Sequence, residues 1–115
     1  MIKIDFTKYL KAQDMIRIVM REKGLSEKQA IAFSINNEIY QQMLEAGYAS
    51  IALSFWGHDD YQRIWDKLDS PIIEIELNKI QKNLIDKVIN TENVDKITAI
   101  TYFLLFTMDD LGYHI

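Results

Sequence analysis

Residues 94–110 restrict the fold most, because their apolar side chains occupy nearly every side of a helix from Ile97 to Met108. A helix with one apolar stripe lies at a surface, whereas a helix that is apolar all round must be enclosed by other elements. This segment therefore predicts a helix in the middle of a bundle. The chain has one proline and four glycines, and so few breaks favour long helices over a β-sandwich with frequent turns.

A second helix that we expect near the centre spans residues 26–47. Ser26 can accept a hydrogen bond from the amide of Gln29, and the Gln29 side chain can reach back to the amide of Ser26, which makes a capping box. Gly47 has no Cβ and can take the left-handed conformation that ends a helix. Apolar residues lie on two sides of this helix, which indicates neighbours on both. Its remaining edge carries acids and amides but no base.

The rest of the chain predicts further helices before and between these two. Apolar side chains repeat in it at the spacing i, i+3, i+4 and i+7 that places them on one helical face. Glycine or proline stands at several of the expected ends. The expected helices run from Asp5 or Thr7 to Lys23, over residues 48–55, over residues 61–68 with Asp59 or Asp60 as the N-cap, and from Ser70 and Pro71 to Val88.

Residues 73–77 also alternate between apolar and acidic side chains in the manner of a β-strand. A lone strand is not stable, and no partner strand is evident in the sequence. We therefore expect these residues to belong to the helix that Ser70 and Pro71 begin. Residues 1–4 are too short to assign to an element.

Length and composition agree with one globular domain over residues 1–115. Hydrophobic residues make up 49% of the chain and aromatic residues 11%. The absence of cysteine excludes a disulfide scaffold and a thiolate metal site. We predict an all-α fold, a compact single-domain bundle of five or six helices around residues 27–46 and 94–110.

The sequence contains no recognisable targeting or membrane segment. Its first residues lack the basic stretch, apolar core and cleavage site of a signal peptide. No run approaches the roughly 18 apolar residues of a membrane span. We therefore expect a soluble cytoplasmic protein with no membrane partner.

Charge is distributed unevenly along the chain. Residues 1–30 carry seven Lys and Arg against four Asp and Glu, residues 31–78 carry two against eight, and residues 79–115 carry four against five. The net charge is −4. Neutralising phosphates requires Lys and Arg, so an acidic chain with an acidic middle is unsuited to direct nucleic-acid binding. It suits a basic protein partner, or the acids serve solubility alone.

Few residues in the chain could support catalysis. His58, Asp59 and Asp60 contain the His-Asp pair of metal phosphohydrolases of the HD type, but those sites need further histidines and His114 is the only other one. A structural explanation is sufficient, since Gly57 can end one helix and either aspartate can cap the next. We therefore predict no catalytic residue, no metal site and no cofactor, and a protein that is not an enzyme.

Two other features point to binding. Asp109 and Asp110 lie at the expected C-terminal end of the last helix, where the helix dipole disfavours negative charge. This placement favours an external use, with fraying of the helix end as the alternative. Trp56 and Trp65 flank the acidic turn at residues 58–60, with Tyr61 between them. Their helical spacing fits core positions for both tryptophans, whereas an exposed Trp56 beside carboxylates would suit a protein interface.

In size, acidity, lack of cysteine and lack of a catalytic set, the chain resembles the small acidic immunity proteins of bacterial contact-dependent growth inhibition systems. The resemblance implies a one-to-one cytosolic complex with a toxin domain, often a nuclease whose site is basic. We predict a non-catalytic protein-binding inhibitor; the alternative is a helical adaptor or regulatory subunit. The sequence leaves open whether the partner is another copy of this chain. The residues predicted to bind the partner are Glu38, Glu45, Trp56, His58, Asp59, Asp60, Tyr61, Asp66, Asp69, Glu74 and Glu76.

Overall fold

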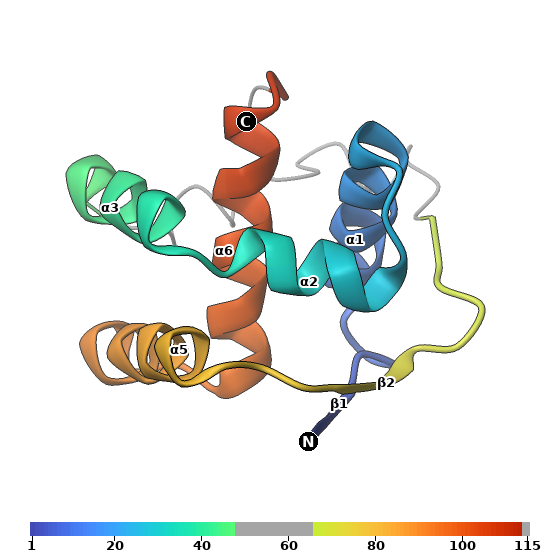
Figure 1. The fold of residues 1–115 in the computed structure, drawn as a ribbon, viewed down its shortest axis with the longest axis horizontal. Helices are drawn as coiled ribbons and strands as arrows, with labels where there is room; N and C mark the ends of the chain where they lie inside the picture. Colours follow the sequence, from blue (N-terminus) through green and yellow to red (C-terminus); the bar gives the residue numbers. More distant parts are fainter. Residues whose placement is uncertain (48–65, 114–115) are drawn as a thin grey trace.

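The computed structural model describes residues 1–47 and 66–113. Within these residues the chain forms five helices and one two-stranded sheet (Figure 1). The expected mostly helical fold is confirmed. The helix expected over residues 48–55 lies outside the described residues, as does most of the helix expected over residues 61–68; residues 66–68 are described and are not helical, so that part of the prediction was wrong. The elements are β1 (Ile2–Asp5), α1 (Leu10–Lys23), α2 (Glu27–Ser34), α3 (Asn37–Ala46), β2 (Ile72–Ile75), α5 (Lys79–Glu92) and α6 (Lys96–Asp110).

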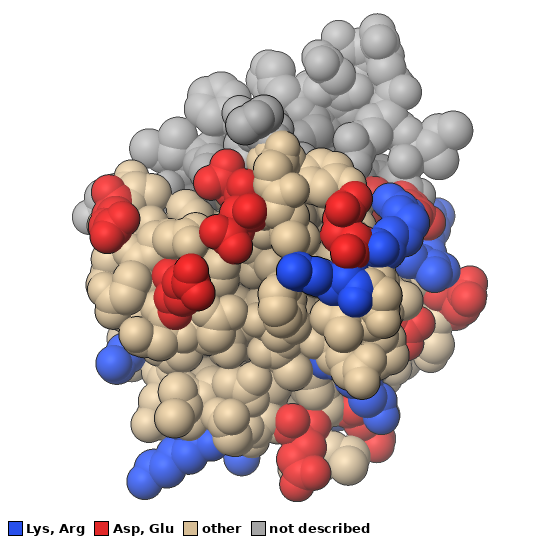
Figure 2. Space-filling view, turned by 45° about the horizontal axis from the view of Figure 1, so that its top comes forward, with Lys and Arg blue, Asp and Glu red and all other residues tan. Residues whose placement is uncertain are grey.

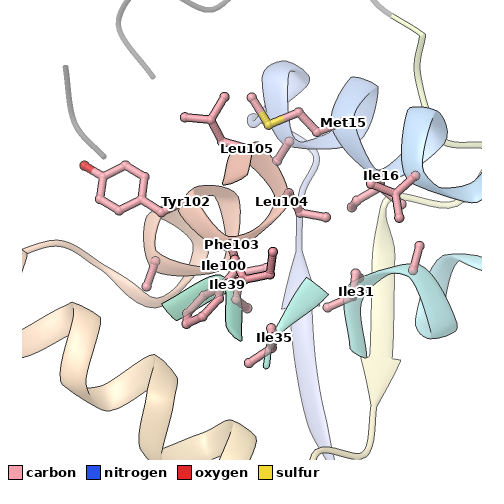
Figure 3. Packing of buried hydrophobic residues seen from close by; sticks show 14 of the residues in the cluster. Met15, Ile16, Ile31, Ile35, Ile39, Ile100, Tyr102, Phe103, Leu104 and Leu105 are labelled. Carbon is pink, nitrogen blue, oxygen red and sulfur yellow. The ribbon is translucent and has the colours of Figure 1, made fainter. Parts of the chain in front are cut away.

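Helix α6 is the centre of the fold. Residues 99–108 are all buried, and α1, α2, α3 and α5 each pack against this helix (Figure 1). Figure 3 shows Ile39 of α3 beside Phe103, and Met15 of α1 beside Leu105. A helix that is apolar on every side has no face for water, so the prediction of an enclosed helix is confirmed.

The helix expected over residues 26–47 is two helices, and the prediction of one continuous helix was wrong. The capping box at its start is present, and Gly47 follows the end of α3 with a φ of +91°. Helix α2 ends at Ser34, however, and Asn36 begins α3 by accepting a hydrogen bond from the amide of Ile39 at 2.9 Å. The same side chain donates to the carbonyl of Phe33 at 2.8 Å, so one asparagine satisfies groups of both helices.

Helix α3 is attached to the core by a narrow edge. Its buried residues are Ile39 and Met43, both of which face the rest of the core cluster. The other side chains of the helix are exposed or half-buried, and Figure 1 shows α3 projecting from the body beside α6. Most of its surface is therefore open to solvent.

Residues 72–75 form a strand, so the helix expected from Ser70 and Pro71 was wrong. Strand β2 pairs with β1 in antiparallel register, with Ile4 opposite Ile73, and the alternation in the sequence is that of a half-buried sheet. Pro71 extends the ladder by accepting from the amide of Phe6 at 2.9 Å. Helix α5 begins only at Lys79, after a capping box between Asn78 and Gln81.

The start of α1 also differs from the expectation, whereas its end agrees. Asp5 accepts a hydrogen bond from the amide of Thr7 at 2.9 Å, but this closes a turn before the helix. The helix itself begins at Leu10 and ends before Gly24, which has a φ of +64°. That left-handed conformation lets the amide of Leu25 reach the carbonyl of Met20 at 3.0 Å, and the helix ends before Gly24 as the sequence predicted.

Candidate functional site

The predicted partner-binding residues do not form one surface in the described part of the chain. Trp56, His58, Asp59, Asp60 and Tyr61 lie outside the described residues. The six others occupy three separate places, namely α3 for Glu38 and Glu45, the segment beside α1 for Asp66 and Asp69, and β2 with the residue after it for Glu74 and Glu76.

Asp66 and Asp69 are neutralised within the protein. Arg17 on α1 lies 3.3 Å from Asp69, measured from Nη2 to Oδ1, and its Nε lies 3.8 Å from Oδ1 of Asp66. Arg21 forms a hydrogen-bonded ion pair with Asp66. Arg17 also donates through both nitrogens to the carbonyl of Lys67, at 3.0 and 3.1 Å. Carboxylates that already face two arginines offer little net charge to a basic partner.

Two polar side chains inside the apolar stripe of α1 hold this segment in place. Gln13 is 2% exposed; its Nε2 donates to the carbonyl of Phe6 at 2.8 Å, and its Oε1 accepts from the amide of Leu68 at 2.9 Å. Asp14 accepts from the amide of Asp66 at 3.2 Å. Neither role was predicted from the sequence. The signal for them was a glutamine followed by an aspartate at buried positions of α1, where apolar residues are usual and a polar residue needs hydrogen-bond partners.

Glu74 and Glu76 lie on the outward side of the β2 segment. Both are exposed, while the alternate residues Ile73, Ile75 and Leu77 are buried. Lys3 of β1 stands opposite Glu74 in the sheet register and is exposed on the same side. A cross-strand pair of opposite charges reduces the field that these acids present to a partner.

Glu38 and Glu45 share an edge of the molecule with the acid pair at the end of α6. They are separated by about two helical turns, and Gln42 lies between them on the same face as i+4 from Glu38 and i−3 from Glu45. The Nε2 of Gln42 donates to Oδ1 of Asp110 at 3.1 Å. We name Glu38, Glu45, Asp109 and Asp110, all four exposed, the acidic edge.

The acidic edge is visible on the surface as a region of one sign. Figure 2 shows acidic groups over the side that carries α3 and the C-terminal end of α6, and no Lys or Arg between them among the described residues on this face. Over α1, acidic and basic groups are mixed. Helix α3 itself contains no Lys or Arg. No basic side chain of α3 offsets these carboxylates, so the acidic edge presents a negative potential.

Asp109 and Asp110 lie at a helix end that is closed by hydrogen bonds. The amide of Tyr113 donates to the carbonyl of Met108 at 3.0 Å, and Gly112 takes a φ of +97°. The Tyr113 hydroxyl donates to Oε1 of Glu22 at 2.6 Å, which raises the pKa of Tyr113. Hydrogen bonds thus close the helix end at which this unfavourable charge placement occurs.

A helix cap and a turn account for the two described carboxyl groups with shifted pKa values. Hydrogen bonding by Thr98, through its backbone amide at 2.7 Å, lowers the pKa of Asp95, the N-cap of α6. Hydrogen bonds from Thr7 likewise lower the pKa of Asp5. In both cases the cause is a local structural bond and not a cluster of acids at a site. Within residues 1–47 and 66–113, no group of three or more His, Asp or Glu residues is arranged to hold a metal ion.

Comparison with known proteins adds no relative. No protein-family model, no curated protein and no solved structure matches the chain. None of the helices in the described ranges has the length and apolar character needed to span a membrane. The function is therefore inferred from the surface features of the fold.

Proposed function

We propose that this protein is a non-catalytic inhibitor that binds a basic protein partner through the acidic edge. The observation that supports this proposal is the hydrogen bond from Gln42 to Asp110, which brings the carboxylates of α3 and of the end of α6 onto one edge. Charge of one sign on one edge raises the rate of encounter with a partner of opposite sign and fixes the orientation of approach.

The size, the acidity and the lack of a catalytic set in the sequence favour one kind of inhibitor, an immunity protein. Such a protein binds a cognate toxin domain in the cytoplasm of the producing cell and blocks its site. A nuclease-type toxin must carry Lys and Arg for the phosphates of its substrate, and an acidic edge complements such a site. On this proposal the protein itself binds no nucleic acid and uses no cofactor.

A helical adaptor or regulatory subunit is the second candidate, because α3 also carries exposed apolar side chains. Leu44 is 50% exposed on this helix. An adaptor interface would be dominated by apolar burial, and its association would depend weakly on salt. An inhibitor steered by the acidic edge would associate more slowly as salt rises, since charges are screened over about 8 Å at physiological ionic strength.

The test uses two double charge reversals with the same change in net charge. Glu38→Lys with Glu45→Lys changes the acidic edge, and Glu74→Lys with Glu76→Lys changes the acids of the β2 segment. The partner to try first is the C-terminal domain of the protein encoded next to this one. Association is measured by stopped flow at low and high salt, and protection is measured by co-expression in growing cells.

Reversal on α3 should lower the association rate by about tenfold or more at low salt and abolish protection of the cells. Reversal on β2 should leave both nearly unchanged, and circular dichroism should show the same helical content in both variants. An association rate that ignores both salt and the α3 reversal would reject the inhibitor proposal and favour the adaptor.

A further inference from the structure

A groove with a volume of about 330 Å³ runs between α3 and α5. Both helices pack against α6 (Figure 1), and residues of both line the groove. We name it the α3–α5 groove. Its lining residues are Tyr40, Met43, Leu44 and Gly47 on and after α3, and Val88, Thr91 and Glu92 on α5.

The groove has an apolar floor and an apolar rim. Met43 and Val88 are buried and continue the core cluster, whereas Leu44 is 50% exposed. Tyr40 is half-buried, and its ring lies under the ammonium of Lys87, with 5.6 Å from Nζ to the ring centroid. A half-exposed leucine above a buried apolar floor is a place where an inserted side chain would lose contact with water on most of its surface.

The size of the groove fits a side chain better than a cofactor. Sites for small molecules have volumes of roughly 300–1,000 Å³ and hold several convergent polar groups. The α3–α5 groove lies at the lower end of that range, and among the described residues its polar lining comes from the side chains of Tyr40, Thr91 and Glu92. One large apolar side chain from a protein partner is the ligand of matching size and chemistry.

The charge around the groove indicates the character of that partner. Among the described residues, Glu92 is the charged residue of the lining. Glu45 of the acidic edge is exposed on α3, outside the lining and about 100° round the helix from Leu44. The ammonium of Lys87 already faces the ring of Tyr40. Lys or Arg next to the inserted side chain would pair with Glu92.

We propose that the α3–α5 groove binds an apolar side chain of the basic partner, flanked in the partner by Lys or Arg that pair with Glu92. This proposal rests on the proposed function and identifies the anchor of the same interface. The acidic edge governs the approach of the partner, and the groove governs how long the complex lasts, because buried apolar anchors act mainly on dissociation.

The test uses a synthetic lysine-rich peptide with one central phenylalanine. Two matched peptides serve as controls, one with alanine in place of phenylalanine and one with glutamate in place of every lysine. Binding to the full chain is followed by the amide shifts of α3 and α5 in an NMR titration. Thr91→Trp fills the groove from α5, Leu44→Ala removes its rim, and Ile80→Ala removes a 66% exposed side chain of α5 outside the lining.

The phenylalanine peptide should shift the amides around residues 40–47 and 88–92 and saturate. Its affinity should fall about tenfold or more with Leu44→Ala, with Thr91→Trp and with alanine in the peptide, and change less than about twofold with Ile80→Ala. The glutamate peptide should not bind. Circular dichroism of each variant checks that the fold is retained.

Several results would overturn the groove proposal. These are no saturable shift with the phenylalanine peptide, equal binding of the alanine or glutamate peptide, and equal losses from Leu44→Ala and Ile80→Ala. A concentration-dependent dimer that Thr91→Trp abolishes would assign the groove to a second copy of this chain instead. If reversal of Glu38 and Glu45 slows association with the intact partner while the groove variants change nothing, the groove proposal fails and the proposed function stands.

Discussion

Gln42 of α3 donates a hydrogen bond to Asp110 at the end of α6, with 3.1 Å between Nε2 and Oδ1. The amide is uncharged, so it orients the carboxylate without cancelling its negative charge. The bond joins residues 68 positions apart in the sequence and fixes the exposed end of α6 beside α3. The acidic edge is a product of this tertiary contact, since neither helix carries it alone.

The acid pair at the end of α6 should reduce stability and favour binding. Changing Asp109→Asn and Asp110→Asn together should raise the free energy of unfolding, by about 0.3–1 kcal/mol per charge at low ionic strength, because the negative charge opposes the helix dipole. The side-chain amide introduced at position 110 would still offer an oxygen to Gln42. Urea denaturation measures the gain, and association with the basic partner should slow in the same variant.

The control for this prediction removes an acid from the opposite kind of helix end. Glu27 lies in the first turn of α2, where negative charge is favourable, so Glu27→Gln should lower the free energy of unfolding by a similar amount. If the double variant of Asp109 and Asp110 is also less stable than the wild type, these acids support the fold and are not retained for a partner.

Asn36 should be the residue that separates α2 from α3. Its Oδ1 caps α3 and its Nδ2 donates to the carbonyl of Phe33, so Asn36→Ala should cost about 0.5–2 kcal/mol of stability. Asn37→Ala is the matched control, because Asn37 is the exposed first residue of α3. Hydrogen exchange should show loss of protection at the start of α3 in the first variant alone. Equal effects from the two changes would contradict the capping role.

Gln13 should be the most sensitive polar residue of the core. Gln13→Leu leaves the amide of Leu68 without its partner, and a buried unsatisfied group costs about 1–3 kcal/mol, whereas the carbonyl of Phe6 keeps its hydrogen bond from the amide of Tyr9. The free energy of unfolding from guanidinium denaturation measures the loss. Gln41→Leu, at an exposed position of α3, should change it by less than about 0.5 kcal/mol. If Gln13→Leu lowers the free energy of unfolding as little as Gln41→Leu does, the Gln13 side chain contributes through its volume and not through its hydrogen bonds.

Asp95 should make stability depend on acidic pH. Because hydrogen bonding by Thr98 lowers the pKa of this carboxyl below 3.8, the bonded carboxylate stabilises the folded state above that pH. The contribution is lost as the pH falls from 3.8 through the lower folded-state pKa. Asp95→Asn keeps a capping oxygen that does not titrate. The free energy of unfolding of this variant should therefore depend less on pH in this window than that of the wild type.

Local signals in the sequence predicted the helix ends that are formed by a capping side chain or by a glycine. The capping box of Ser26 and Gln29 is present, and Gly24 and Gly47 have positive φ. The enclosed helix near the C-terminus was likewise visible, since apolar residues on every side leave no exposed face. These features depend on residues within a few positions of each other, which is why sequence alone predicts them.

Predictions from the sequence were wrong where a contact between residues far apart in the chain decides the structure, or where a break has only a weak local signal. The pattern of residues 73–77 fits a helix or a strand, and β2 forms because Ile4 and its neighbours in β1 supply a partner from the far end of the chain. The break at Asn36 has no glycine or proline to mark it, and only an asparagine that can cap was available as a signal.

The candidate site was predicted in part. Glu38, Glu45, Asp109 and Asp110 were each noted in the sequence, but their arrangement on one edge depends on the contact between Gln42 and Asp110. The pairing of Asp66 with Arg17 and Arg21 was not visible, because the arginines lie on α1 and the acid lies far along the chain. The α3–α5 groove depends on how two helices sit on a third, which no local pattern encodes.

Helix α3 meets the core through the buried Ile39 and Met43 and the half-buried Tyr40, and its other positions face solvent, the groove or the acidic edge. Substitutions at those other positions therefore change the surface without disturbing the packing around α6. A lineage could retune which partner it recognises by altering this one helix, while the anchoring side chains and the caps at Asn36 and Gly47 keep its position constant. Recognition and foldability are in this way assigned to different residues of the same ten-residue element.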